Sequence, residues 1–193
     1  MGVFDKLFGK KKKVEQAAPD IDRMPPMEQF VYRFTQNGGR FLLAQTAEQL
    51  AAYLRAILAE EEVAYYYVSR PGLQKMALDN DIPMRIAFPG KPSEAALLSD
   101  VMYLIRNTGG LMISSLQTGG KPLKDLPQVL VFVARAAQLR PDMHEAMASV
   151  NKDFHGQYPS QIRTLTRFND AQDQSSAKTC YLILYEESGT DKA

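Results

Sequence analysis

The run Val129–Ala134, with the sequence VLVFVA, constrains the fold more than any other segment because all six of its residues are apolar. A strand that has one face in water alternates apolar and polar residues, whereas this run must be buried on both faces. Strands of this kind occur in parallel sheets whose two faces are covered by helices. The run therefore predicts an α/β protein with a buried parallel sheet.

Strand-like and helix-like patterns alternate along the rest of the chain. Short apolar segments bounded by glycine, proline or polar residues predict strands at Arg40–Ala44, 63–69, 84–88, 103–106, 111–115, 162–166 and Thr179–Tyr185. Apolar residues at helical spacing predict helices over 27–34, 46–58, 71–80, from near Ser93 and from about Pro141, the last with an apolar stripe of Leu139, Met143, Ala146, Met147 and Val150. The polar segment 169–178 predicts an exposed loop before the last strand. The alternation predicts a three-layer α/β fold with an open, mostly parallel sheet, in which the segments around Asn107 form a hairpin or an antiparallel insertion.

Composition narrows the class of protein. The chain has 193 residues, 45% of them hydrophobic and 23% charged, which is typical of one globular domain. The net charge of +1 favours no nucleic-acid partner, and no apolar run reaches the length of a membrane span or of a signal peptide's core. With one cysteine and two histidines, neither a disulfide framework nor a metal site is expected. These features predict a cytoplasmic protein that binds no metal.

The first residues differ from the rest. Residues 1–13 hold five lysines and one aspartate, so this segment carries +4 and the remaining chain −3. We expect a polar, basic tail over 1–26, an α/β domain over 27–187 and a short C-terminal tail over 188–193. Val3, Phe4, Leu7 and Phe8 could form a small apolar face beside the lysines. The tail is then either a solvated terminus or a contact with an anionic membrane surface or a partner.

Two glycine-bearing segments are candidates for a ligand site: NTGG at 107–110 and TGGK at 118–121. Glycines let backbone amides approach an anion closely, and neighbouring hydroxyls add donors. Neither segment fits the phosphate-binding motif G-x-x-x-x-G-K-[ST], so a plain turn and a loop remain the alternative interpretation. The predicted site, for a small anionic ligand, consists of Asn107, Thr108, Gly109, Ser114 and Ser115.

Catalytic groups are not indicated by the residue pattern. Cys180 lies in an apolar strand segment and is expected to be a buried, unreactive thiol. His144 stands beside Glu145 on a predicted helix, an arrangement typical of a solvated pair. No two titratable groups are placed in contrasting environments, as acid–base chemistry would need. The catalytic residues, if there are any, are therefore unknown at this point.

Three ordered blocks stand out along the chain: FVYRFTQNGGRFL at 30–42, NTGGLMISS at 107–115 and LPQVLVFVA at 126–134. Together they resemble the LUD-domain family, the lactate utilization proteins of the LutC/YkgG type. The resemblance covers about residues 27–187 and is nearest to short members with an LFGKKK-like head, here at 7–12. It implies the three-layer α/β fold of the NagB/RpiA/CoA-transferase-like superfamily.

The resemblance also implies a function. Members act with cysteine-rich iron–sulfur proteins in oxidising lactate to pyruvate, so this chain would be an accessory subunit that binds no cofactor, with the clusters in its partners. Two departures stand out: longer members have Glu-Thr-Gly-Thr where this chain has 107–110, and a G-P-S-x-x-A-D-I-E segment before the last strand is missing here. Thr108 and Gly109 are the positions that carry over. The alternative is an enzyme of the same superfamily that acts on a phosphorylated or carboxylated metabolite.

Overall fold

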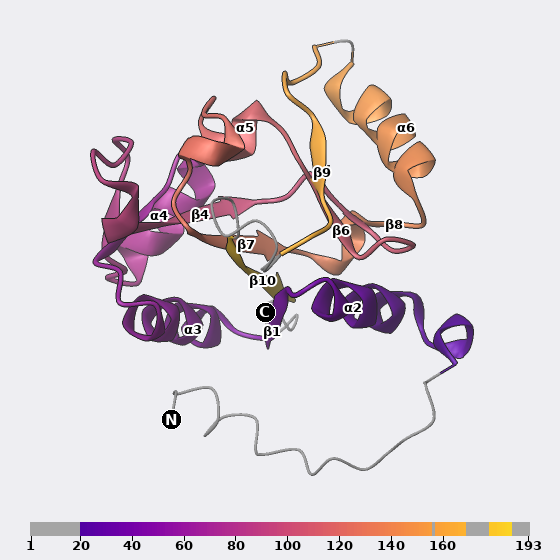
Figure 1. Ribbon diagram of the computed structural model, residues 1–193, viewed down its shortest axis with the longest axis horizontal. Coiled ribbons are helices and arrows are strands. Elements are labelled where there is room, and N and C mark those ends of the chain that lie inside the picture. Colours follow the sequence, from indigo (N-terminus) through magenta and orange to yellow (C-terminus); the bar gives the residue numbers. More distant parts are fainter. Residues whose placement is uncertain (1–19, 156, 169–177, 187–193) are drawn as a thin grey trace, which may run out of the picture.

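A six-stranded parallel sheet runs through the protein in the computed structural model, which describes residues 20–155, 157–168 and 178–186 (Figure 1). In spatial order the strands are β1 (Arg40–Ala44), β10 (Thr179–Tyr185), β7 (Val129–Ala134), β4 (Ala95–Asp100), β2 (Tyr65–Tyr67) and β3 (Met84–Arg85). All neighbouring pairs are parallel. Strand β7 is buried along its whole length between β10 and β4, as its unbroken apolar sequence predicts.

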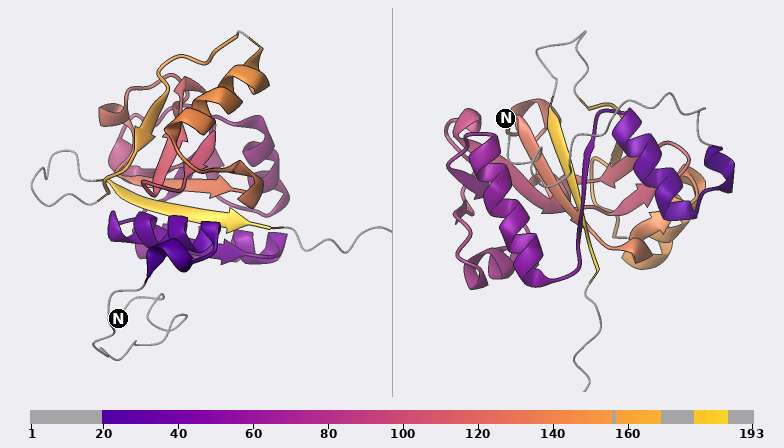
Figure 2. Two further views of the ribbon diagram at one scale, coloured as in Figure 1. Left: turned by 90° about the vertical axis from the view of Figure 1, so that its right-hand side faces the viewer. Right: turned by 90° about the horizontal axis from the view of Figure 1, so that it is seen from below.

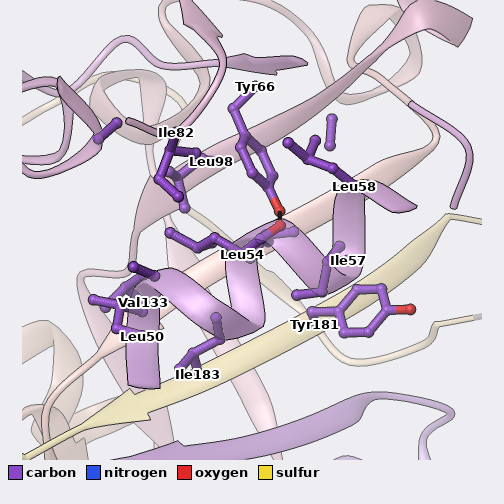
Figure 3. Close-up of a cluster of buried hydrophobic side chains, with 14 of the residues drawn as sticks. Leu50, Leu54, Ile57, Leu58, Tyr66, Ile82, Leu98, Val133, Tyr181 and Ile183 are labelled. Atoms are coloured by element: carbon purple, nitrogen blue, oxygen red, sulfur yellow. Dashed lines mark hydrogen bonds between the residues drawn. The ribbon is translucent and has the colours of Figure 1, made fainter. Parts of the chain in front are cut away.

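Helices α3 (Ala47–Glu60) and α4 (Pro71–Asp79) cover one face of this sheet. Leu54 and Ile57 of α3 pack on Leu98 and Ile183 of the sheet, and all four side chains are fully or almost fully buried (Figure 3). The buried hydroxyl of Tyr66 donates a 2.9 Å hydrogen bond to the carbonyl of Leu54, which satisfies the one polar atom of that ring. This cluster is the larger core of the protein, and one end of it forms the floor of the cleft described below.

The other face of the sheet is covered by helix α2 (Pro26–Gln36) and by a second sheet. Figure 2 shows α2 and α3 on opposite sides of β10. The second sheet has the order β8 (Leu139–Arg140), β5 (Tyr103–Ile105), β6 (Gly110–Ile113) and β9 (Arg163–Leu165). Phe34 of α2 and Leu104 of the second sheet join the same apolar cluster as Phe132 and Leu182 of the main sheet.

Helix α6 (Met143–Phe154) covers the outer face of the second sheet, far from α3 (Figure 1). Its buried residues Ala146 and Val150 pack against Ile105 and Met112. Helix α5 (Ser115–Thr118) is a single turn between β6 and β7. Four short 3₁₀ helices complete the described elements, at Ile21–Arg23, Pro92–Glu94, Leu123–Asp125 and Ala136–Gln138.

The predicted three-layer α/β fold with an open, mostly parallel sheet is confirmed, and the strands Arg40–Ala44, Val129–Ala134 and Thr179–Tyr185 have the predicted bounds. The segments around Asn107 form the expected antiparallel hairpin, β5–β6. Thr46 caps α3 by accepting a hydrogen bond from the amide of Gln49.

The helix predicted from near Ser93 is wrong. The sequence AALLSD at 95–100 forms strand β4, preceded by one 3₁₀ turn at Pro92–Glu94. Alanine and leucine favour a helix locally, but this segment is paired on both sides, with β2 and β7, and its first five residues are buried. Burial in the middle of the sheet overrides the local propensity.

The predicted helix from about Pro141 begins at Met143, because Asp142 is its N-cap and accepts a hydrogen bond from the amide of Glu145. Leu139 lies in β8 rather than on this helix. Met143 and Met147, predicted for the apolar stripe, are 42% and 37% exposed. The buried stripe of α6, Ala146 and Val150, is therefore narrower than predicted.

Several predictions fall on residues 1–19, 156, 169–177 and 187–193, outside the described ranges. The basic tail with its membrane contact and most of the loop expected at 169–178 are among them. Lys178, the last residue of that loop, is 7% exposed rather than open to water, because its ammonium donates hydrogen bonds to the carbonyls of Leu126 and Pro127. In the described ranges no helix has the length and apolar character that crossing a membrane requires.

Candidate ligand-binding cleft

The carboxyl ends of three neighbouring strands bring charged residues together. Arg70 follows β2 and is the N-cap of α4, Asp100 is the last residue of β4, and Arg135 comes directly after β7. These strands lie side by side in the order β7-β4-β2. In open parallel sheets ligands bind at this edge, because the loops there diverge to opposite faces and leave a crevice.

Asp100 is held by hydrogen bonds from two residues. The Nε of Arg70 lies 3.0 Å from its Oδ1 and the Nη2 of Arg70 lies 3.0 Å from its Oδ2, so the pair is bidentate. The side-chain amide of Gln117 donates to Oδ1 at 3.1 Å. A carboxylate offers about four acceptor positions, so one position on Oδ2 remains for a ligand donor. The carboxylate is therefore oriented but not saturated.

Gln117 is itself fixed from behind by Ser114, the N-cap of α5. Its Oε1 accepts hydrogen bonds from the backbone amide of Ser114 at 3.0 Å and from the Ser114 hydroxyl at 2.8 Å. Gln117 and Ser114 are 3% and 1% exposed. A buried polar network that is satisfied in this way fixes the position of the group at its end, here Asp100.

Arg135 adds a positive charge without a matching carboxylate. Its backbone amide donates to the side chain of Gln138 at 2.7 Å, and Gln138 in turn donates to the carbonyl of Val101 at 2.6 Å. The loop after β7 is thereby tied to the end of β4. The Arg135 side chain is exposed, and none of the carboxylates in the described ranges lies within ion-pair distance of it. The site thus has surplus positive charge at a fixed backbone position.

Two pockets share these groups, and together we call them the cleft. Arg70, Asp100, Arg135 and Gln138 line both pockets. The apolar pocket, of about 520 Å³, is further lined by Leu50, Pro71, Gly72, Leu73, Met76, Val133, Ala134 and Tyr185. The second pocket, of about 350 Å³, is also mostly apolar, and we call it the polar pocket because Tyr103, Gln117, Arg140 and Asp153 add polar side chains to its wall; Val101, Met102, Leu116, Ala137 and Phe154 complete the lining. Both volumes lie in the range of small-molecule sites.

The polar pocket contains a tyrosine that stays neutral. The Tyr103 hydroxyl donates a hydrogen bond to Asp153, and the Arg140 guanidinium lies 4.5 Å from the centre of the Tyr103 ring. Burial, together with the bond to Asp153, raises the pKa of Tyr103 to about 12. Arg140 also donates to Ser149 at 2.7 Å. The polar groups of these residues already interact with one another, so we expect this wall to define the shape of the cleft.

The structure places the predicted site residues Asn107, Thr108 and Gly109 in the β5–β6 hairpin turn, outside both pockets. The side-chain amide of Asn37, at the end of α2, donates to the carbonyl of Thr108 at 2.8 Å. Gly109 has a φ of +64°, and a Cβ on it would lie 2.4 Å from the backbone nitrogen of Phe34. The turn is thus packed tightly against α2.

Ser114 and Ser115, the other two predicted residues, lie at the start of α5. Ser114 reaches the cleft indirectly, through Gln117 and Asp100, while the Ser115 amide donates to the carbonyl of Ser160 at 2.9 Å. The structure does not bring the five residues together, and their role as a ligand site stays a prediction.

Sequence reasoning did not single out Arg70, Asp100 or Arg135. A usable signal is present for the two arginines, because each directly follows a strand-like segment. Arg70 follows VAYYYVS at 63–69, and Arg135 follows VLVFVA at 129–134. Asp100 carries no such signal, because the sequence AALLSD at 95–100 locally favours a helix and not a strand that ends at Asp100.

The cysteine and the histidine–glutamate pair considered as chemical groups in the sequence lie where they were predicted. Cys180 is fully buried, as predicted, and burial raises the pKa of its thiol far above the ordinary value. His144 and Glu145 are both exposed. Among the described residues there is no group of three or more His, Cys, Asp or Glu side chains that could hold a metal ion.

The fold and the cleft define a three-layer α/β protein with an open parallel sheet and a crevice at its carboxyl edge. In structure the chain is similar to a DUF162 family protein from Deinococcus radiodurans, whose crystal structure superimposes with a TM-score of 0.60 at 15% sequence identity. The similarity covers 87% of this chain and 99% of that chain. At this identity the similarity shows a shared fold. No family model and no curated protein matches the sequence.

Proposed function

We propose that the protein is a LUD-domain protein that binds a small carboxylate in the cleft and serves as an accessory subunit in the oxidation of lactate, or of a related 2-hydroxy acid, together with iron–sulfur proteins. The DUF162 family is the LUD-domain family, so the structural similarity and the sequence blocks support the same assignment. The NagB/RpiA/CoA-transferase-like superfamily, the LutC-like subtype and a cytoplasmic location are part of this proposal.

The unmatched charge of Arg135 beside the oriented Asp100 carries the proposal. A guanidinium binds a carboxylate through two parallel hydrogen bonds, so Arg135 would hold the carboxylate of a hydroxy acid. The 2-hydroxyl would donate to the remaining acceptor position on Oδ2 of Asp100. The two contacts together distinguish a 2-hydroxy acid from a simple carboxylate.

An accessory role fits the groups that line the cleft. Oxidising a 2-hydroxy acid to a 2-oxo acid releases electrons that must pass to an acceptor, and the proposal assigns that acceptor to the clusters of the iron–sulfur partners. This chain's share is then to bind and orient the acid. In the cleft, Asp100 is held by Arg70 and Gln117, and Tyr103 is bound to Asp153.

A second candidate function is an enzyme that acts on a phosphorylated or carboxylated metabolite. The observation that favours it is the polar pocket, since a cleft with two connected parts has room for two reacting groups. Release of product from hydroxy-acid, sugar-phosphate or CoA-ester substrates by the isolated chain would support it over the accessory role.

Calorimetric titration of the full chain with lactate, pyruvate and inorganic phosphate tests ligand binding. We expect a 2-hydroxy acid to bind to the wild-type chain and to lose about tenfold or more in affinity with Arg135→Gln. Arg23→Gln is the matched control, because Arg23 is an exposed arginine paired with Asp20 outside the cleft. Equal affinity in wild type and Arg135→Gln would overturn the proposed contact.

The partner part of the proposal is tested by affinity purification of the full chain from its native host under anaerobic conditions. Recovery of cysteine-rich iron–sulfur subunits in fixed proportion supports the accessory role. Recovery of the chain alone, with normal growth of a deletion strain on lactate, contradicts that role and favours the second candidate function.

A further inference from the structure

We infer that the cleft selects 2-hydroxy acids whose side chain is branched or aromatic and larger than the methyl group of lactate, with that side chain in the apolar pocket. The inference rests on the proposed binding of the carboxylate by Arg135. The contact with Arg135 fixes the carboxylate of the ligand but does not determine its side chain, and the inference concerns that side chain.

The walls of the apolar pocket are continuous with the main core. Leu50 and Val133 belong to the larger buried cluster and lie at one end of it in Figure 3. Leu73 and Met76 of α4 also line the pocket and pack against the same cluster. A ligand side chain placed here contacts aliphatic carbon and loses part of its contact with water.

The apolar wall and the charge meet at the end of one strand. Val133 and Ala134 close β7 and line the pocket, and Arg135 is the next residue. A ligand whose carboxylate binds Arg135 therefore has its remaining atoms next to apolar surface. The arrangement fits an amphipathic acid better than one that is polar throughout.

The volume of the pocket favours a larger side chain. At about 520 Å³ the apolar pocket is of the size that holds drug-like ligands, and a three-carbon acid would leave most of it unfilled. The aliphatic part of the wall offers water few hydrogen-bond partners, so a ligand side chain there replaces weakly bound water. Each additional buried methylene of the ligand gains affinity until the pocket is filled.

A ligand series tests this directly by calorimetry. We expect affinity for the wild-type chain to rise by about fourfold per added methylene from lactate through 2-hydroxybutanoate, and by about 50-fold from lactate to 2-hydroxy-4-methylpentanoate. 3-Phenyllactate is expected to bind at least as well as the latter. A flat series, in which all these acids bind equally well, would overturn the inference.

A plugged variant locates the effect. A Cβ on Gly72, which lines the apolar pocket, meets no atom within 4 Å, so a side chain can begin there, and Gly72→Leu adds bulk to this wall of the pocket. Gly90→Leu is the matched control, because Gly90 is exposed, equally unobstructed and outside the pocket. We expect Gly72→Leu to abolish the preference for long side chains while lactate still binds, and Gly90→Leu to retain the preference.

The outcomes separate the two proposals. A loss of about tenfold or more in affinity in Arg135→Gln, with a steep series in the wild type, supports both. Binding that depends on Arg135 but not on side-chain length leaves the carboxylate contact standing and contradicts the selectivity. A series that stays steep in Gly72→Leu places the side chains elsewhere and also overturns the inference. Absence of binding by every acid refutes the proposed ligand function itself.

Discussion

The hairpin turn at 107–110 and the cleft both contain glycine, yet they use it in opposite ways. At Gly109 a Cβ would meet the backbone of Phe34 at 2.4 Å, so the missing side chain permits the hairpin to pack on α2. At Gly72 a Cβ would meet nothing within 4 Å, so the missing side chain leaves open space in the cleft. A glycine in the sequence therefore indicates close packing or an open site only once its neighbours are known.

The two regions differ equally in their polar groups. In the turn the carbonyl of Thr108 is bound by Asn37, and the Thr108 hydroxyl accepts from the amide of Gly110 at 3.2 Å. In the cleft, Asp100 retains acceptor capacity and Arg135 has no ion-pair partner among the described residues. Surplus charge beside a cavity is a stronger indication of a ligand site than a glycine-rich loop.

Gly109→Ala should have the largest effect on stability. The positive φ is unfavourable for alanine, and the added Cβ overlaps the backbone at Phe34, so we expect the free energy of unfolding to fall by about 3 kcal/mol or more. Urea unfolding followed by circular dichroism measures this. A loss below about 1 kcal/mol would contradict the close packing of the hairpin on α2.

Asp100→Asn should have an intermediate effect. The change keeps the shape but removes the charge that Arg70 pairs with, and since both side chains are about one-third exposed we expect a loss of about 1–2 kcal/mol in the free energy of unfolding. The same titrations should show weaker binding of 2-hydroxy acids. The measured quantity is the ratio of the affinity for the 2-hydroxy acid to the affinity for its analogue without the hydroxyl. If this ratio is the same in Asp100→Asn as in the wild type, Asp100 does not contact the ligand hydroxyl.

Thr108→Val should have a smaller effect and bears on the sequence-based site. The substitution removes the hydrogen bond that the exposed Thr108 side chain accepts from the buried amide of Gly110, so a loss of about 1 kcal/mol in unfolding free energy is expected. Binding of carboxylates should not change. A drop in affinity that exceeds the drop in stability would restore the hairpin as the ligand site.

Gly72→Ala should have the smallest effect and the opposite sign. Gly72 lies in the first turn of α4 with space for a Cβ, and alanine reduces the freedom of the unfolded chain, so the free energy of unfolding should rise by about 0.5 kcal/mol. Gly109→Ala and Gly72→Ala both replace one glycine by alanine, so a difference between them in urea unfolding measures the effect of the surroundings of the new Cβ. Strong destabilisation by both substitutions would remove the contrast between the two regions.

The sequence predicted the parts of the fold that depend on local pattern. The run Val129–Ala134 indicates a strand buried on both faces regardless of its partners, and Thr179–Tyr185 is equally apolar. Ala95–Asp100 was missed because its alanines and leucines are good helix formers, and only its position between β2 and β7 makes it a strand. Long-range pairing decides such segments.

The cleft was out of reach of the sequence for the same reason. Arg70, Asp100 and Arg135 lie far apart in the chain and meet only because β2, β4 and β7 are neighbours in the sheet. That order depends on crossover connections that no local pattern specifies. Ser114, in contrast, was singled out for its hydroxyl, and the structure shows it holding Gln117 behind Asp100.

Amide NMR spectra of the isotope-labelled full chain, titrated with 2-hydroxy-4-methylpentanoate, distinguish the cleft from the hairpin turn as the ligand site. The glycine amides report on both regions, since Gly72 lines the cleft while Gly109 and Gly110 lie in the hairpin turn. We predict saturable shifts for Gly72, Arg135 and Gln138, with Gly109 and Gly110 unchanged. Saturable shifts confined to the hairpin glycines, or no saturable shift at any of these residues, would contradict the assignment of the cleft as the ligand site.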